Sequence, residues 1–399
     1  MAGNVFYVAT LYMYKYIAFL FALLMAMASC SHGDDPTPGP YVPQKAGKTI
    51  FVFMPYTGSS VDNPNVDGTN LYYSLLNNIS DMETAVRQNG GLGNCHLIIY
   101  IACDSNTSHL INIGYHKGSV VRDTLKTYTS PGYMSADGMA SILADIKHYA
   151  PADTYATIVG SHGEGWLPKY STTRFFGGLK YQMDVTDFAA AILAAGLKMQ
   201  FVMFDDCYMS GVEVAYDLKD AAQYLIASTS EMMGYGMPYH NILKYLMADK
   251  PDYESLCRDF ISFYRAYSMP YGTIAVTDLS RIDSFAALMK QLNSTHLFDS
   301  QREPELQDLD VAHFTPTVYY DLGSYLRLLC GADAAAYGEA MAQADLLVPY
   351  RGNTDMIYSS SGKSVLRLEE YSGLTCSDPS ENIYAVVAKK QTAWWKATH

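Results

Sequence analysis

Short, continuous apolar runs alternate with longer amphipathic segments along the first two-thirds of the chain. Continuous hydrophobicity predicts strands covered on both faces, and their alternation with helices predicts a mostly parallel sheet. The predicted strands are residues 48–56, 95–103, 154–162, 198–206, 223–229 and 272–278. The predicted helices are residues 70–88, 136–150, 184–196 and 211–221. We therefore expect an α/β fold with three layers, in which helices cover both faces of the sheet.

Two regions depart from this alternation. Residues 104–130 alternate polar and apolar positions around Lys117 and Gly118, which predicts a hairpin or an edge strand. Beyond about residue 252, helix-like segments dominate. We interpret residues 48–250 as one domain and residues 251–399 as a mainly helical C-terminal subdomain. The strand predicted at 272–278 leaves this boundary open by tens of residues.

The first residues carry the pattern of an export signal. Residues 16–29 form an uncharged run, shorter than the roughly 20 residues that span a bilayer, and end on Met-Ala-Ser before Cys30. This ending resembles a bacterial lipobox. It predicts a signal peptide over residues 1–29, lipidation of Cys30 and anchoring at the outer membrane or cell surface, with a transmembrane anchor as the alternative. Residues 30–47, rich in Pro and Gly, predict a flexible tether.

Composition and charge narrow the class of protein. A hydrophobic content of 49% is ample for a buried core. The 40 acidic and 27 basic side chains give a formal net charge of -13, which disfavours nucleic acid as a partner. The six cysteines beyond Cys30 have neither metal-ligand spacing nor a short disulfide framework, so we expect mostly free thiols and no zinc site.

Two reactive side chains follow consecutive predicted strands. His162 comes directly after one apolar run, in GSHGEGW, and Cys207 comes just past the next, in FDDCYMSG. The carboxyl ends of parallel strands meet at one edge of an open α/β sheet, where ligands bind. A thiol and a base that meet there suggest a cysteine nucleophile activated by a histidine. Each residue alone is more typical of a structural role; the pair on successive strands favours chemistry.

The SHG turn followed by the D-x-C-Y-M turn resembles the clostripain family of cysteine peptidases, in the caspase-like clan. The resemblance implies a caspase-like three-layer α/β/α sandwich and an endopeptidase acting on peptides or proteins. Cys207 would attack the peptide carbonyl to form a thioester, and His162 would act as general base and acid. The backbone N–H groups of Gly163 and Cys207 would hold the oxyanion.

The resemblance also implies a specificity site. Asp205 lies two residues before Cys207, on the same face of the strand, and would bind an Arg or Lys before the scissile bond. A carboxylate that caps the following helix is the alternative. Asp206 stands where the family usually has a small residue, and alternation predicts that it points away from Cys207.

Polar residues after the next strand lie where caspase-like folds form one wall of the specificity pocket. Ser230 and Glu231, with Ser228 before them, are therefore candidate substrate-binding residues, and Glu231 would be a second anion for a cationic side chain. A solvated surface glutamate is the alternative.

Family members commonly cut themselves after a basic residue between the histidine and the cysteine. Arg174 and Lys180 are the candidate cleavage positions here, and an intact chain is the alternative. Calcium is known in the namesake of the family, so the resemblance allows it here, but no ligand set can be assigned. The loop beginning at Asn63 has Ser74 where a calcium loop needs Glu, so we interpret it as a turn. No other cofactor is expected.

Two rival functions remain open at this point. One is the same machinery with a preference for non-basic residues. The other is a surface lipoprotein that keeps the fold and binds ligands without turnover. Retention of both His162 and Cys207 favours the enzyme.

Overall fold

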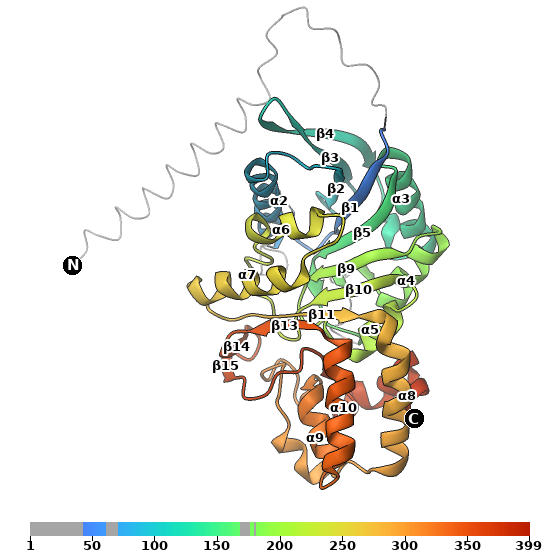
Figure 1. Ribbon diagram of the computed structural model, residues 1–399. Coiled ribbons are helices and arrows are strands. Elements are labelled where there is room, and N and C mark those ends of the chain that lie inside the picture. Colours follow the sequence, from blue (N-terminus) through green and yellow to red (C-terminus); the bar gives the residue numbers. More distant parts are fainter. Residues whose placement is uncertain (1–42, 61–70, 168–175, 179–180) are drawn as a thin grey trace, which may run out of the picture. The chain divides into compact units, whose positions relative to one another are not determined.

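A nine-stranded sheet forms the centre of the protein (Figure 1). The computed structural model describes residues 43–60, 71–167, 176–178 and 181–399, and residues 43–399 form one compact unit. The strand order is β13-β11-β10-β9-β5-β1-β2-β3-β4. The strands are β1 (Ala46–Met54), β2 (Cys95–Ala102), β3 (Ser108–His116), β4 (Ser119–Tyr128), β5 (Ala152–Gly160), β9 (Met199–Asp205), β10 (Ala222–Ala227), β11 (Thr273–Asp278) and β13 (Tyr350–Asn353).

The five central strands are parallel, and two antiparallel strands extend each edge. At one edge, β3 and β4 form the predicted hairpin. Its turn is Lys117-Gly118, with φ of 49° and 85°, the left-handed pair that a two-residue hairpin requires. At the other edge, β11 and β13 join the sheet although both lie beyond residue 250. The central sheet therefore extends across the boundary predicted there.

Helices cover both faces of the sheet and bury a core on each, which confirms the predicted α/β sandwich. Along β1, Phe51 and Phe53 pack into one core while Ile50, Val52 and Met54 pack into the other, as strand alternation requires. One face is covered by α2 (Leu71–Gln88), α6 (Tyr239–Met247) and α7 (Tyr253–Ala266). The opposite face is covered by α3 (Ala136–Tyr149), α4 (Val185–Ala194), α5 (Val212–Leu218) and α8 (Ile282–Thr295).

Most of the last hundred residues add helices and a short strand pair to the second face. Their core residues, such as Tyr325 and Trp394, belong to the same cluster as Phe51. A second strand pair, which contains Ile357, packs with Leu309 and Val311 in a small separate cluster. The helices are α9 (Leu322–Cys330), α10 (Ala334–Leu347), α11 (Ile383–Ala388) and α12 (Ala393–Thr398), and the strand pairs are β12 (Tyr320–Asp321) with β16 (Thr375–Cys376) and β14 (Met356–Ser359) with β15 (Ser364–Arg367). Short 3-10 helices lie at Gly132–Met134, Leu279–Arg281, Ser300–Glu305 and Lys389–Gln391.

The predicted signal peptide and Cys30 lie outside the described residues. Within the part of the chain that is described, no helix has both the length and the apolar character needed to cross a bilayer.

Candidate active site

The register of two parallel strands brings His162 and Cys207 to one place. Gly160, the last residue of β5, pairs with Asp205, the last residue of β9. Each reactive residue follows its strand end by two positions, and neighbouring strands are about 4.8 Å apart. Both side chains accordingly line one pocket of ≈ 400 Å³ at the carboxyl edge of the sheet. This is the juxtaposition that the two sequence motifs predict.

Gly163 holds the two turns in contact. It belongs with His162 to β6 (His162–Gly163), which pairs with β7 (Phe176–Gly178), and β7 pairs with β8 (Tyr181–Met183). A Cβ at position 163 would lie 2.7 Å from the Cys207 carbonyl oxygen and 3.1 Å from the Cys207 nitrogen. Only glycine lets the two main chains approach this closely.

Asp206 ties the same turns together through hydrogen bonds. The Ser161 N–H donates to Asp206 Oδ1 at 2.6 Å, and the Ser161 hydroxyl lies 3.0 Å from Oδ2. The carboxyl is buried, which raises its pKa well above the usual value. Asp206 therefore connects the residue before His162 to the residue before Cys207, a role that the sequence pattern does not predict.

The Cys207 thiol is half-buried and accepts a hydrogen bond from the Met232 N–H at 3.2 Å. Burial raises its pKa well above the usual value, and the charges of Glu231, Glu164 and Asp206 add to this, against the Met232 hydrogen bond. The pocket therefore disfavours the thiolate form of Cys207. Nucleophilic attack by this sulfur requires a base that takes the proton as the bond forms.

Asp205 lies deep in the pocket and is 7% exposed. Its Oδ2 accepts from the Tyr239 hydroxyl at 2.8 Å and from Asn78 Nδ2 at 3.0 Å, and its Oδ1 accepts from the Met237 N–H at 2.9 Å. Burial raises the pKa of this carboxyl to about 7, opposed by the bonds from Tyr239 and Met237. The side chain points toward α2 and α6, so it does not cap the helix that follows Cys207.

A glycine keeps the approach to Asp205 open. Gly236 lines the pocket with φ of 74°, and a Cβ there would lie 2.7 Å from Oδ1 and 2.8 Å from Oδ2 of Asp205. Any side chain at this position would crowd the carboxylate.

Of the predicted wall residues, Glu231 lines the pocket and Ser230 does not. The Glu231 carboxylate accepts from the Ser360 N–H at 2.8 Å. The Ser230 hydroxyl is instead buried, 3.1 Å from Thr273 Oγ1, in a cluster of hydroxyl groups under the pocket. Ser230 contributes its carbonyl oxygen, which accepts from the Tyr208 N–H at 3.1 Å.

Sequence reasoning missed several residues of the pocket. Glu164 and His313 both line it, and His313 Nε2 lies 2.9 Å from Glu164 Oε2. Ser360 and Ser361 reach it from the turn between β14 and β15. His313 and the two serines lie far from both motifs in sequence, so no local pattern could connect them to the site. Glu164 stands inside GSHGEGW, where its closeness to His162 was a usable signal.

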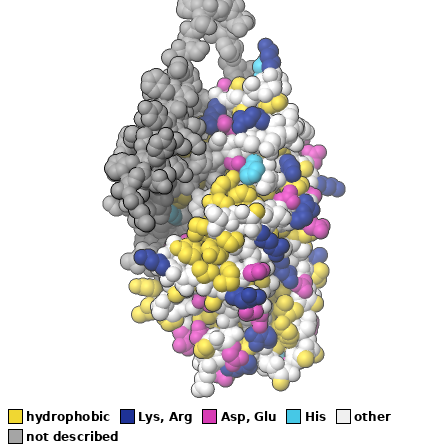
Figure 2. Space-filling view, turned by 90° about the vertical axis from the view of Figure 1, so that its left-hand side faces the viewer, with side chains coloured by type: hydrophobic (Ala, Val, Ile, Leu, Met, Phe, Trp, Pro, Cys, Tyr) yellow, Lys and Arg dark blue, Asp and Glu magenta, His cyan; other side chains and the backbone are white. Residues whose placement is uncertain are grey.

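The pocket is strongly acidic. Glu164, Asp205, Asp206 and Glu231 line it, and no lysine or arginine of the described residues does. On the molecular face in Figure 2, by contrast, basic and acidic side chains are interspersed. The pocket therefore gathers carboxyl groups with no basic side chain of the described residues to balance them, which suits a cationic ligand.

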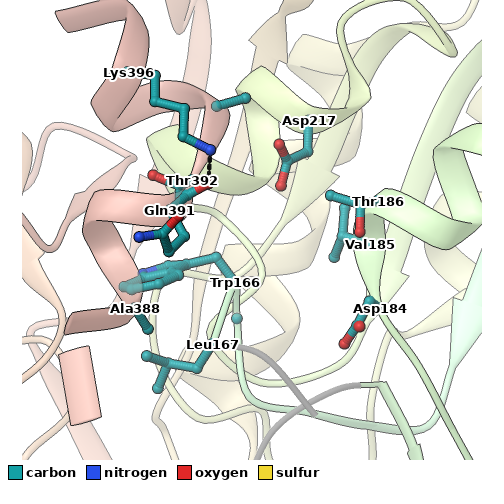
Figure 3. Close-up of a pocket in the computed structure, with 12 residues that line it drawn as sticks. Trp166, Leu167, Asp184, Val185, Thr186, Asp217, Ala388, Gln391, Thr392 and Lys396 are labelled. Carbon is teal, nitrogen blue, oxygen red and sulfur yellow. Dashed lines mark hydrogen bonds between the residues drawn. The ribbon is translucent and has the colours of Figure 1, made fainter. Parts of the chain in front are cut away.

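A second cavity, of ≈ 330 Å³, lies between α4, α5 and the C-terminal helices (Figure 3). Trp166, Asp184 and Asp217 line it together with Lys396, whose Nζ donates to the Gln391 carbonyl oxygen. None of the predicted catalytic or substrate-binding residues is part of its wall. It does not lie where His162 and Cys207 meet.

Several predictions cannot be located. Arg174, Lys180 and residues 63–70 of the predicted turn lie outside the described residues, whereas Ser74, its last position, lies in α2. Within the described ranges, no group of three or more His, Cys, Asp or Glu side chains is arranged to hold a metal ion. The six cysteines beyond Cys30 are free thiols, as expected.

A sheet flanked by helices on both faces, with a histidine and a cysteine meeting at its carboxyl edge, defines a caspase-like cysteine peptidase. The chain belongs to the clostripain family, whose model matches residues 62–371. It is therefore a cysteine peptidase.

Solved structures of the same family resemble the chain over most of its length. A secreted C11 cysteine protease from Bacteroides thetaiotaomicron, iotapain, is 40% identical, with a TM-score of 0.82 over 90% of this chain and 100% of that one. A clostripain from the same species, in complex with the peptide inhibitor BTN-VLTK-AOMK, is 46% identical, with a TM-score of 0.54 over 56% of this chain and 99% of that one. An inactive zymogen C11 protease from Parabacteroides distasonis is 25% identical, with a TM-score of 0.75 over 90% and 99% of the two chains. No curated protein matches the chain.

Proposed function

We propose that this protein is an endopeptidase that cleaves after Arg or Lys, with Cys207 as nucleophile and His162 as general base and acid. The observation that carries the proposal is the pairing of Gly160 with Asp205, which delivers both side chains to one acidic pocket. The raised pKa of the thiol fits this assignment, because a protonated cysteine needs a neighbouring base.

The proposed reaction moves one proton back and forth. His162 takes the Cys207 proton as sulfur bonds to the substrate carbonyl carbon, and then returns it to the leaving amine as the C–N bond breaks. Water next attacks the thioester and gives its proton to His162. The C–S bond then breaks, and His162 passes that proton to the sulfur, which regenerates the thiol and the neutral imidazole. The N–H groups of Gly163 and Cys207, whose main chains are in contact, would hold the oxyanion at each stage.

Asp205 supports the preference for basic residues. It lies deep in the pocket, Gly236 leaves space beside Oδ1, and Oδ1 accepts only one hydrogen bond among the described residues. An ammonium or guanidinium group that reached Oδ1 would offset the cost of ionising this buried carboxyl. The inhibitor bound to the Bacteroides clostripain carries a lysine in its name, VLTK, which agrees with a basic preference in a relative.

The remaining assignments extend the same proposal. Glu231 supplies a second anion at the pocket wall, and the chain matures by cutting itself after Arg174 or Lys180. Export follows the predicted lipoprotein signal, with the acyl anchor on Cys30. The relative described as secreted fits export.

A fluorogenic peptide panel with Arg, Lys, Ala, Leu or Asp before the cleaved bond tests the specificity. We expect turnover of the Arg and Lys substrates to exceed that of the others by about 100-fold or more. Intact-mass analysis with a basic chloromethyl ketone should show one adduct on wild type and none on Cys207→Ala. The same spectra report whether the wild-type chain is cut between His162 and Cys207 while the variant stays intact.

One observation favours the rival preference for non-basic residues. Asp205 already accepts three hydrogen bonds, and its pKa of about 7 leaves it partly protonated near neutral pH. If the carboxyl is only a structural acceptor for Tyr239 and Met237, the panel would show Ala or Leu substrates turned over as fast as Arg and Lys. That outcome would overturn the basic specificity and leave the peptidase assignment standing.

A further inference from the structure

His313 comes from the C-terminal part of the chain and contacts both turns of the pocket. Its Nε2 lies 2.9 Å from Glu164 Oε2, two residues past His162. Its ring stacks on Tyr208, the residue after Cys207, with centroids 5.2 Å apart and planes at 27°. The side chains of His313 and Glu164 are only 15% and 18% exposed. One imidazole therefore bridges the two segments that carry the proposed catalytic pair.

The surroundings hold this ring in place. Tyr319 also stacks on Tyr208, with ring centroids 5.4 Å apart. The Tyr319 hydroxyl donates to the Glu164 carbonyl oxygen. Phe314 meets the His313 ring edge-on at 4.4 Å. Tyr208 itself has φ of 62°, a left-handed conformation that a bulky residue adopts only when its surroundings impose it. The aromatic cluster of Tyr208, His313, Phe314 and Tyr319 fixes the backbone immediately after Cys207.

The charges that face His313 are acidic. They are Glu164, from the turn after His162; Asp310, from its own loop; and Glu231, from the segment after β10. Tyr208 is the titratable ring stacked against it, and Tyr319 stacks on Tyr208 in turn. Burial disfavours the charged imidazole, but the hydrogen bond and charge of Glu164 outweigh it, with Asp310 and Glu231 adding, so the pKa of His313 is raised. Nδ1 is buried and has no hydrogen-bond partner among the described residues.

We propose that His313 is a positioning residue of this peptidase, which locks the His162 turn to the Cys207 turn and neutralises the Glu164 carboxylate beside the thiol. The proposal rests on the assignment of Cys207 and His162. In the protonated state, the imidazolium cancels one of the carboxylates that disfavour the Cys207 thiolate. A glutamine at position 313 can keep the hydrogen bond to Glu164 but cannot carry the charge.

The sign of the pH dependence follows from the raised pKa. His313 carries its charge below that pKa and loses it as the pH rises through it, so the neutralising effect is present on the acid side only. The ratio of wild-type to His313→Gln activity should therefore be about tenfold near pH 6 and should fall toward about one near pH 9. A side chain that merely supports the fold would lower activity equally at all pH values.

Two readouts at several pH values test the proposal. One is kcat/KM on the best peptide of the panel, and the other is the rate at which iodoacetamide alkylates Cys207, followed by intact mass with Cys207→Ala as the blank. The alkylation rate does not depend on the peptide preference, so a failure of the basic specificity would not be mistaken for a failure here. His313→Phe, which keeps a stacked ring on Tyr208, serves as a second variant in case the glutamine unfolds.

Glu164→Gln completes a double-mutant cycle. Because the neutral side chain leaves no charge to cancel, His313→Gln in that background should change either rate by less than about twofold. His296→Gln, which breaks the histidine–carboxylate pair of His296 with Asp333 outside the pocket, is the matched control and should leave the profile unchanged. A wild-type to His313→Gln ratio that does not vary with pH, or an equal loss in the Glu164→Gln background, would overturn the proposal.

Discussion

Two cavities of similar size each contain a carboxyl whose pKa is raised to about 7, and they differ in what surrounds it. Asp205 accepts hydrogen bonds from Tyr239, Asn78 and Met237 at the carboxyl edge of the sheet. Asp217 lies in the cavity of Figure 3, where burial alone raises its pKa and no hydrogen bond from the described residues reaches it. A raised pKa by itself therefore does not identify the functional site.

What separates the two cavities is the geometry around the carboxyl. The Asp205 pocket also contains a histidine and a cysteine delivered by paired strands, and a glycine that clears the approach to the acid. The Asp217 cavity has an indole, one lysine and helix termini, and none of the described residues in its wall is a cysteine or a histidine. A catalytic site is therefore recognised by several backbone elements that bring reactive side chains together. A buried carboxyl alone is only costly to ionise.

The largest expected effect on activity comes from removing the proposed nucleophile, which only the Asp205 pocket contains. We expect Cys207→Ala to lower kcat/KM by more than about 1,000-fold, because no other group in the pocket can form the thioester. Peptide hydrolysis measures this directly. Cys103→Ala, at another incompletely buried thiol, should retain wild-type activity. Residual activity above a few per cent in the Cys207 variant would place the chemistry elsewhere.

Exchanging each acid for its amide sharpens the comparison. Asp205→Asn should lower kcat/KM on Arg and Lys peptides by about 100-fold, since a cationic side chain loses its charged partner. Asp217→Asn should change it by less than about twofold, since that cavity holds no proposed substrate contact. Steady-state kinetics on both variants decide the matter, and equal effects would remove the distinction between the two carboxyls.

Substitutions at two glycines of the same loop distinguish an effect on access to Asp205 from a general disturbance of the loop. Gly236→Ala should raise KM for basic peptides by about tenfold, because its Cβ would press on both Asp205 oxygens. Gly234 also lines the pocket, but a Cβ there meets nothing within 4 Å, so Gly234→Ala is the matched control. Similar KM values for the two variants would contradict the role given to Gly236.

The pH dependence of substrate binding should follow the Asp205 carboxyl. Its pKa of about 7 means that the anion forms as the pH rises through neutrality, so 1/KM for Arg peptides should increase several-fold between about pH 6 and pH 8. The same measurement on Asp205→Asn should give a flat profile. A profile that is equally steep in both proteins would assign the ionisation to another group.

The smallest expected effect is that of Asp217 on the free energy of unfolding of the protein. A buried acid with a raised pKa stabilises the folded state at low pH, and that contribution is lost as the pH rises through about 7. Asp217→Asn should therefore raise the free energy of unfolding by about 1 kcal/mol or more at about pH 8 and leave it unchanged at about pH 3, where the carboxyl is protonated in both the folded and the unfolded chain. Urea unfolding at the two pH values measures this. A variant that is less stable at pH 8 would show that the carboxylate has a partner.

The strand core and the proposed catalytic pair could be predicted from sequence because their signals are local. Five of the six predicted apolar runs, among them the one before His162, became central parallel strands, and the two motifs stand directly at strand ends. The wall of the pocket could not be predicted in this way. His313 and Ser360 reach it only through tertiary packing, and Ser230 turned inward because Thr273, on a neighbouring strand, offered a hydroxyl. The strand predicted at 272–278 had left the boundary near residue 250 open and became β11, whereas β13 was not among the predicted strands.

The β5–β9 ladder has a consequence for a chain that is cut. Gly160 and Asp205 sit on neighbouring strands in the middle of the sheet, and β5 and β9 are each flanked by a further parallel strand. A single break in the connection between these strands would yield two polypeptides that stay associated, because each supplies half of the same hydrogen-bonded ladder and of the cores above and below it. The imidazole and the sulfur would then belong to different molecules and still share one reaction centre.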